Sequence, residues 1–380
     1  MLNYFDIELS DEERLVQRTT REWVDAEAMP IIADCFEQGE FPKRLIPQMA
    51  ELGLLGASLP KYGAGMPYTA YGLICQELER CDTGLRSFVS VQSSLCMFPL
   101  YTFGTEQQQE RYLPKMVKGE LIGCFGLTEP DHGSDPGGME TRAERDGDGW
   151  VLNGTKMWIT NGSVADLAII WARTPDGIRG FAVDTDTAGF SARDVKHKLS
   201  LRASVTSELH LDDVRVPGSA LLAGTSGLGS ALKCLNEARF GIAWGTVGAA
   251  MACLESALEY AKIRPQFGKP IAAFQLTQAK LADMLTAVTQ GQLLALQLGR
   301  LKESGRLRSA QVSLAKRANA AMALDVARTA RTILGGNGIS LEHPIFRHMV
   351  NLETVLTYEG THEIHTLVLG QDLTGIAAYH

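Results

Sequence analysis

The feature that most limits the fold of this chain is a change in the spacing of its hydrophobic residues, from helical to extended and back to helical. Helical spacing governs roughly the first 120 residues, short extended runs replace it, and helical spacing returns from about residue 226 to the end. We therefore predict a mainly α-helical protein into which a small antiparallel barrel or sandwich is inserted. A length of 380 residues is compatible with three such parts, which we place at 1–120, 121–225 and 226–380.

Short local signals place individual elements. Ser10 precedes three acidic residues and predicts a helix start, whereas Gly305 and the pair Gly335-Gly336 predict helix stops. The dipeptide Asn153-Gly154 lies between two extended runs and predicts a hairpin, and Asn161-Gly162 predicts a second turn. Further strands are expected at residues 167–172, 180–183 and 207–216.

Charge and cysteine content exclude several classes of function. The chain has 36 Lys and Arg against 44 Asp and Glu, a formal net charge of −8, so it has no basic surplus with which to bind nucleic acid. Its seven cysteines form no C-x-x-C pair, which is typical of free thiols in a reducing compartment. The N-terminal residues lack the order of a leader sequence, and residues 241–254 are too short a weakly polar run to span a membrane. We expect a cytoplasmic protein, although a mature mitochondrial form would look the same.

Two segments in the β region could bind a ligand. Residues 125–135 combine hydroxyls with glycines and can donate N–H groups to an anion or a flat heterocycle, or can be an ordinary surface loop. Trp158 can stack on an aromatic ring whose edge Thr160 binds, or it can be a core tryptophan.

Two further segments lie in the C-terminal region. Residues 236–239, with Arg264 and Phe267, can hold phosphates or can form helix-surface ion pairs. In residues 357–365, Glu359 lies beside an aromatic residue and a glycine, where a dry pocket would make it a usable base. The run His-Glu-Ile-His has the wrong spacing for a zinc site, so we expect no metal.

The chain resembles the flavin-dependent acyl-CoA dehydrogenases over nearly its whole length. The most specific matches are residues 125–135, 152–156 with 158–161, Arg264 with 267–271, 334–338 and 358–361. Residues 79–87 and 90–94, together with 357–365, resemble the branch of the family that acts on glutaryl-CoA. The resemblance implies an N-terminal helical domain, a middle β-barrel and a C-terminal four-helix bundle. It also implies FAD as cofactor, electron-transfer flavoprotein as electron acceptor and a homo-oligomer, usually a tetramer.

The resemblance also implies roles for individual residues, with Glu359 as the catalytic base. Contacts with the acyl-CoA are implied for Glu79, Arg86, Ser87, Ser134, Asn236, Arg239, Tyr358 and Gly360. Contacts with FAD are implied for Phe125, Leu127, Thr128, Gly133, Ser134, Trp158, Ile159, Thr160, Arg264, Phe267, Gln275, Gly335, Gly336, Thr361 and Glu363. One departure is Thr332, where many members of the family carry glutamine, and it puts one cofactor contact in doubt.

Arg86 decides the expected substrate. Its guanidinium would pair with the distal carboxylate of a dicarboxylic acyl-CoA; alternatively it pairs structurally with Glu79 or Asp82. The expected reaction is FAD-dependent oxidative decarboxylation of glutaryl-CoA to crotonyl-CoA and CO2, a step of lysine and tryptophan degradation. Alternatives are a glutaryl-CoA dehydrogenase that does not decarboxylate, an acyl-CoA dehydrogenase of another short-chain substrate, and a non-enzymatic helical scaffold.

Overall fold

Helices form the N-terminal part of the chain, and the first begins where the sequence predicts. The Ser10 side chain accepts a hydrogen bond from the Glu13 backbone, and the Glu13 carboxylate accepts one from the Ser10 backbone, which closes a capping box. The helices are α1 Asp11–Trp23, α2 Met29–Gln38, α3 Ile46–Glu51, α4 Tyr68–Cys81, α5 Thr83–Ser90, α6 Phe98–Phe103 and α7 Glu106–Val117. This computed structural model describes residues 7–378, so residues 1–6, part of the stretch searched for a leader, lie outside the described part.

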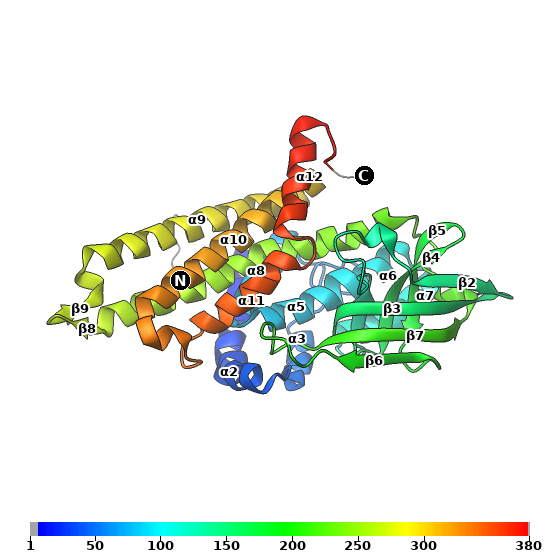
Figure 1. Ribbon diagram of the computed structural model, residues 1–380, viewed down its shortest axis with the longest axis horizontal. Helices are drawn as coiled ribbons and strands as arrows, with labels where there is room; N and C mark the ends of the chain where they lie inside the picture. Colours follow the sequence, from blue (N-terminus) through cyan, green and yellow to red (C-terminus); the bar gives the residue numbers. More distant parts are fainter. Residues whose placement is uncertain (1–6, 379–380) are drawn as a thin grey trace.

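One curled sheet follows the N-terminal helices. Its strands are β1 Gly123–Gly126, β2 Arg142–Asp146, β3 Gly149–Thr160, β4 Leu167–Thr174, β5 Gly177–Asp184, β6 Phe190–Asp194 and β7 Thr206–Val216. The order is β1-β4-β2-β3-β7-β6, with β5 also paired to β4. The predicted β domain is confirmed, but β1 runs parallel to β4 instead of antiparallel, and no pairing joins β5 to β6 within residues 7–378. Figure 1 shows this sheet at one end of the molecule.

The predicted hairpin at Asn153-Gly154 is wrong, because β3 runs straight through it. Residues on both sides of Gly154 pair with the single strand β7, and the register shifts between Leu152 and Gly154. The Asn153 amide exchanges hydrogen bonds of 2.9 and 3.0 Å with Asp213 across this bulge. A Cβ on Gly154 would lie 2.4 Å from the Thr141 hydroxyl oxygen, so the glycine permits a close approach here and not a chain reversal. The turn at Asn161-Gly162 is confirmed.

Long helices return in the C-terminal part, as predicted. They are α8 Leu228–Ile263, α9 Gln275–Glu303, α10 Ser309–Leu334, α11 Ile345–Thr357 and α12 His362–Thr374. The stops at Gly305 and Gly335 are confirmed, and a short hairpin of β8 Pro265–Gln266 and β9 Lys269–Pro270 joins α8 to α9. By length and composition α8 could cross a membrane, but 83% of its apolar window is buried inside the fold. It is the central helix of the bundle in Figure 1, packed between α4 and α10.

Glycines let α4 and α8 approach each other closely. A Cβ on Gly248 of α8 would lie 1.9 Å from the Gln76 carbonyl oxygen, and a Cβ on Gly245 would lie 2.0 Å from the Glu79 carboxylate. On α4, a Cβ on Gly72 would meet the Trp244 ring at 2.4 Å. Side chains at these positions would push the two helices apart. The contact therefore fixes where α4 presents Glu79.

Replacing Gly248 by alanine tests this close packing. Because the nearest atom is backbone, Gly248→Ala is expected to lower the free energy of unfolding by about 1–3 kcal/mol, measured by urea denaturation. Gly229→Ala on the same helix is the matched control, since no atom lies within 4 Å of its added Cβ, and it should leave stability unchanged or slightly raised. Equal effects of the two substitutions would contradict the packing account.

Candidate active site

The turn between α11 and α12 presents Glu359. Its backbone is left-handed, with φ 52° at Glu359 and 92° at Gly360, and such a conformation costs a non-glycine residue on the order of 1 kcal/mol or more. Thr361 then caps α12 by accepting a hydrogen bond of 3.1 Å from the Ile364 backbone. The Glu359 Oε2 atom is buried and has no hydrogen-bond partner among residues 7–378. An unpartnered buried carboxylate oxygen in a strained turn indicates a functional group and not a structural one.

Two cations bind the carbonyl oxygens of this turn. The Lys316 ammonium on α10 donates to the carbonyls of Tyr358 at 3.1 Å, Gly360 at 2.8 Å and, more weakly, Leu356 at 3.5 Å. Arg239 on α8 donates through Nε to the Glu359 carbonyl at 2.6 Å. Of the predicted pair Asn236 and Arg239, Arg239 thus contacts Glu359, whereas Asn236 accepts a hydrogen bond from Arg239 at 3.4 Å and donates one to Ser309 at 2.9 Å. The motif patterns did not single out Lys316.

A buried ion pair lies beside the turn. Arg86 on α5 donates to the Glu79 carboxylate at 2.6 Å and to the Tyr358 hydroxyl, and both charged side chains are almost completely buried. Of the two structural alternatives for Arg86, the pairing with Glu79 is confirmed and the pairing with Asp82 is wrong, because Asp82 instead binds Arg347 at 2.6 Å. Within the described chain the Arg86 Nη1 atom has no recorded partner, and the buried Ser87 hydroxyl has none either. One unused donor, Arg86 Nη1, thus remains near the predicted base, and the Ser87 hydroxyl on the same helix is also unused.

Burial sets the protonation of these groups. It raises the pKa of Glu359, although Arg86, Arg239 and Lys316 each act to lower it. Burial likewise raises the pKa of Glu79 and, to about 12, that of Tyr358. A carboxyl with a raised pKa binds a proton readily, so Glu359 has the character of a general base.

The predicted flavin-facing residues lie on the sheet. The Trp158 side chain is 58% exposed at a left-handed position of β3, with φ 63°, so the alternative of a core tryptophan is wrong. Ile159 points into the core, and Thr160 at the strand end is half-buried. An exposed indole with a hydroxyl beside it fits the flat ring and polar edge of a flavin.

A second buried ion pair anchors the loop between β1 and β2, residues 127–141. The Glu129 carboxylate binds the Lys156 ammonium at 2.8 Å and the backbone N–H groups of Glu140 and Thr141 at 2.6 and 2.9 Å. Lys156 also donates to the Leu127 carbonyl at 3.1 Å. Around this anchor Phe125 and Leu127 are buried, Thr128 is half-buried, and Gly133 and Ser134 are exposed. The sequence patterns did not predict the Glu129–Lys156 pair. The one sign of it in the sequence is Lys156, a lysine at an inward position of a strand.

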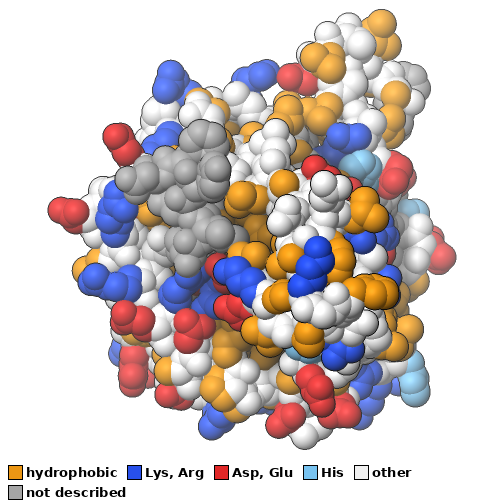
Figure 2. All heavy atoms as spheres, turned by 90° about the vertical axis from the view of Figure 1, so that its left-hand side faces the viewer, with side chains coloured by type: hydrophobic (Ala, Val, Ile, Leu, Met, Phe, Trp, Pro, Cys, Tyr) orange, Lys and Arg blue, Asp and Glu red, His pale blue; other side chains and the backbone are white. Residues whose placement is uncertain are grey.

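The remaining predicted FAD residues lie elsewhere. Arg264, Gln275, Gly335 and Gly336 are exposed, and Phe267 is 94% exposed, at the end of the bundle opposite the sheet (Figure 1). Figure 2 faces this end and shows apolar side chains exposed among charged ones. One chain therefore does not bring these residues to Trp158. Thr361 and Glu363, at the start of α12, do lie beside the Glu359 turn.

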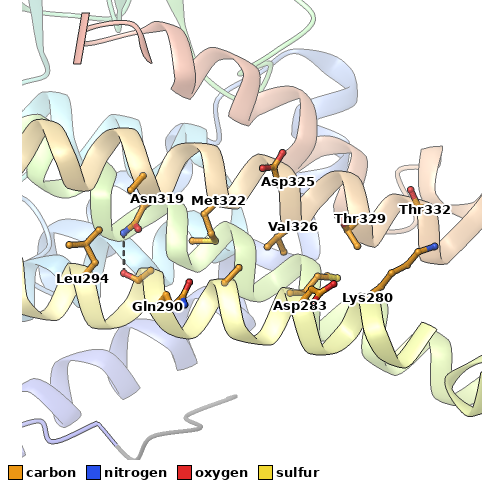
Figure 3. Close-up of a pocket in the computed structure, with 14 residues that line it drawn as sticks. Lys280, Asp283, Gln290, Leu294, Asn319, Met322, Asp325, Val326, Thr329 and Thr332 are labelled. Atoms are coloured by element: carbon orange, nitrogen blue, oxygen red, sulfur yellow. Dashed lines mark hydrogen bonds between the residues drawn. The ribbon is translucent and has the colours of Figure 1, made fainter. Parts of the chain in front are cut away.

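A groove of about 520 Å³ lies between α9 and α10, apart from these residues. In Figure 3 Met322, Val326 and Thr329 of α10 point towards α9 across it, whereas Asp325 points away from α9. Lys280 and Thr332 lie at one end. None of the predicted site residues lines the groove. Among residues 7–378 no three His, Cys, Asp or Glu side chains are grouped so as to hold a metal ion. The seven cysteines are free thiols, and six of them are buried.

Comparison with known proteins yields matches along the whole chain. Models of the acyl-CoA dehydrogenase N-terminal, middle and C-terminal domains match residues 10–120, 124–214 and 225–374. A solved glutaryl-CoA dehydrogenase from Mycobacterium smegmatis is 58% identical, covers 99% of this chain and 98% of its own, and has a TM-score of 0.98. A second from that organism, in complex with FADH2, is 53% identical over 98% and 97% of the two chains, with a TM-score of 0.97. The short-chain specific acyl-CoA dehydrogenase of Bos taurus mitochondria is 36% identical over 97% of this chain and 92% of its own.

The Glu129–Lys156 pair predicts a specific acid sensitivity. Burial opposes the charge on Glu129, but Lys156 and the hydrogen bonds outweigh it and lower its pKa to about 2. The stability from this lowered pKa is present above about pH 4.5 and is lost as pH falls towards 2. Glu129→Gln should therefore lower the free energy of unfolding at neutral pH and flatten its decline between pH 5 and 2, measured by urea denaturation.

Glu140→Gln is the matched control for this prediction, because that carboxylate belongs to the same loop but is 82% exposed. It should retain the wild-type pH profile of stability. An unchanged profile for Glu129→Gln as well would show that the buried pair does not govern acid stability.

Proposed function

The chain belongs to the acyl-CoA dehydrogenase family, and on that premise we propose that it oxidises and decarboxylates glutaryl-CoA to crotonyl-CoA and CO2. FAD is its cofactor. The observation that carries the substrate assignment is the buried Arg86 guanidinium beside Glu359, which retains a donor atom without a partner in residues 7–378. The similarity to solved glutaryl-CoA dehydrogenases supports the same substrate.

Substrate recognition follows from the Arg86 donor. Glu79 accepts from Nε of Arg86 and Tyr358 from Nη2, so Nη1 is the group available to the distal carboxylate of glutaryl-CoA. The unpartnered Ser87 hydroxyl can donate a further hydrogen bond to the same carboxylate. Leaving that carboxylate unpaired in this buried site would cost several kcal/mol. Arg86 therefore selects substrates that end in a carboxylate.

The chemical step begins with removal of the substrate's α-proton. We assign Glu359 as the base, because burial raises its pKa and its Oε2 atom is unpartnered. No residue in 7–378 accepts a hydrogen bond from the Glu359 backbone N–H, which leaves it able to bind the thioester carbonyl oxygen where negative charge develops. When bound, FAD supplies the acceptor for the hydride that leaves the β-carbon.

Decarboxylation follows on the oxidised substrate. Loss of CO2 from glutaconyl-CoA sends the bonding electron pair into the conjugated thioester, and protonated Glu359 returns its proton to give crotonyl-CoA. Glu79 and Tyr358 contact Arg86, so with the distal carboxylate bound to Arg86 they would lie near the departing CO2. By the family resemblance, electron-transfer flavoprotein takes up the two electrons.

We also propose that the enzyme acts as a homo-oligomer, a tetramer by the family resemblance. Arg264, Phe267, Gln275 and the Gly335-Gly336 pair lie at the opposite end of the molecule from Trp158. A second copy of the chain would bring one group to the other and complete the FAD site.

The competing substrate is a monocarboxylic short-chain acyl-CoA, which the similarity to the bovine enzyme favours. Such a substrate leaves Arg86 without its second anion. With glutaryl-CoA, butyryl-CoA and an artificial electron acceptor, kcat/KM should favour glutaryl-CoA by about 100-fold, and mass spectrometry should detect crotonyl-CoA with one CO2 per turnover. Equal rates would remove the role of Arg86, and glutaconyl-CoA as the final product would identify a non-decarboxylating enzyme.

Replacing the base tests the assignment of Glu359. Glu359→Gln keeps the shape of the side chain but cannot accept the α-proton, so it should retain FAD, visible as the yellow absorbance, and lose at least about 1000-fold in kcat. Glu353→Gln is the control, because that carboxylate is exposed on α11, pairs with Arg328 at 2.6 Å and belongs to none of the predicted site residues. Full activity in Glu359→Gln would mean that another group is the base.

A further inference from the structure

We propose that Lys316 is a positioning residue for the reaction: its ammonium holds the left-handed turn that directs the Glu359 carboxylate at the substrate. The inference rests on the proposed function in one respect, namely that Glu359 is the base. Lys316 lies on α10, 43 residues before Glu359 in sequence, and is 1% exposed.

The contacts of Lys316 all lie at the end of α11 and in the turn that follows it. Its Nζ atom meets three carbonyl oxygens, those of Leu356, Tyr358 and Gly360, so the contacts alternate along the five residues that end α11 and precede Thr361. Arg239 takes the carbonyl of Glu359 between them. An ammonium has three N–H donors and matches three acceptors, a set that a neutral amine with two donors cannot satisfy.

The backbone of the turn needs such an anchor. The last carbonyls of α11 have no partner inside the helix and carry the negative end of its dipole, which a buried cation complements. The left-handed conformation at Glu359 is unfavourable by itself for a residue with a side chain. Three hydrogen bonds from one fixed point on α10 compensate for that cost. Relaxation of the turn towards ordinary backbone angles would swing the Glu359 carboxylate away from its site.

The charge of Lys316 also stabilises the ionised form of the Glu359 carboxylate. Glu359 is surrounded by Arg86 from α5, Arg239 from α8 and Lys316 from α10, with Tyr358 preceding it. On α12, Glu363 and His365 face Lys316, and burial lowers the pKa of His365 to about 3, so that residue adds no charge. Burial also lowers the pKa of Lys316 to about 7, while Glu359 acts to raise it, so the ammonium is the dominant form below about pH 7. Removing the Lys316 charge would therefore raise the pKa of Glu359 further.

The test is Lys316→Met in the FAD-loaded enzyme, with kcat expressed per bound FAD. A misplacement of the base by about 1 Å is expected to lower kcat about 100-fold, with KM for glutaryl-CoA changed only a few-fold. In Lys316→Met the acid limb of the pH profile of kcat/KM should move to higher pH. Lys316→Arg keeps the charge and the donors, so its kcat should be at least about 10-fold higher than that of Lys316→Met. A role in folding alone would lower FAD content and melting temperature but would move neither kcat per FAD nor the acid limb.

Arg328→Met on the same helix is the matched control, because Arg328 is an exposed residue paired with Glu353 at 2.6 Å. It should leave kcat, KM and the pH profile unchanged. Should Lys316→Met fail to take up FAD, Lys316→Gln is judged by the same criteria.

The inference is wrong if the Lys316 variants have the wild-type kcat per FAD and an unshifted acid limb.

The role of Lys316 and the proposed substrate can be contradicted independently of each other. If the wild type oxidises butyryl-CoA and not glutaryl-CoA, the substrate assignment is wrong, and the same variants measured with butyryl-CoA still decide the role of Lys316.

Discussion

The active end of this molecule depends on compensating the charges of three cations, the buried Arg86 and Lys316 and the half-buried Arg239. A buried charge costs several kcal/mol unless hydrogen bonds compensate it. Arg86 is compensated by Glu79, Lys316 by three carbonyl oxygens of the turn, and Arg239 by the carbonyl of Glu359. These partners come from α4, α5, α8, α10 and the turn after α11, so the charges hold five elements in one arrangement around a single carboxylate.

The close packing of α4 against α8 also positions the charged groups of the site. Gly245 leaves room for the Glu79 carboxylate, which accepts from Arg86, and Arg86 contacts Tyr358, the residue before Glu359. At the other end of the chain's long axis lie exposed Phe267 and Gly335, for which the family resemblance implies contacts with FAD. In this account one chain positions the acid–base chemistry, and a second copy completes the cofactor site.

Much of the fold and the main candidate base could be predicted from the sequence. The Ser10 cap and the Gly335 stop are local signals, and the structure confirms both. The Asn153-Gly154 hairpin failed because an Asn-Gly pair also suits a bulge, and only the partner strand β7 decides between them. Lys316 was missed for a similar reason, because a lysine in a helix is usually exposed and its three acceptors lie 40 to 44 residues away. Contacts between distant segments leave no local pattern.

A crystal structure of Glu359→Gln with FAD and glutaryl-CoA tests the central claim most directly. The account predicts that the distal carboxylate lies within about 3.2 Å of Arg86 Nη1 and that the side chain at position 359 faces the α-carbon. A distal carboxylate in solvent, or an α-carbon turned away from position 359, would contradict it.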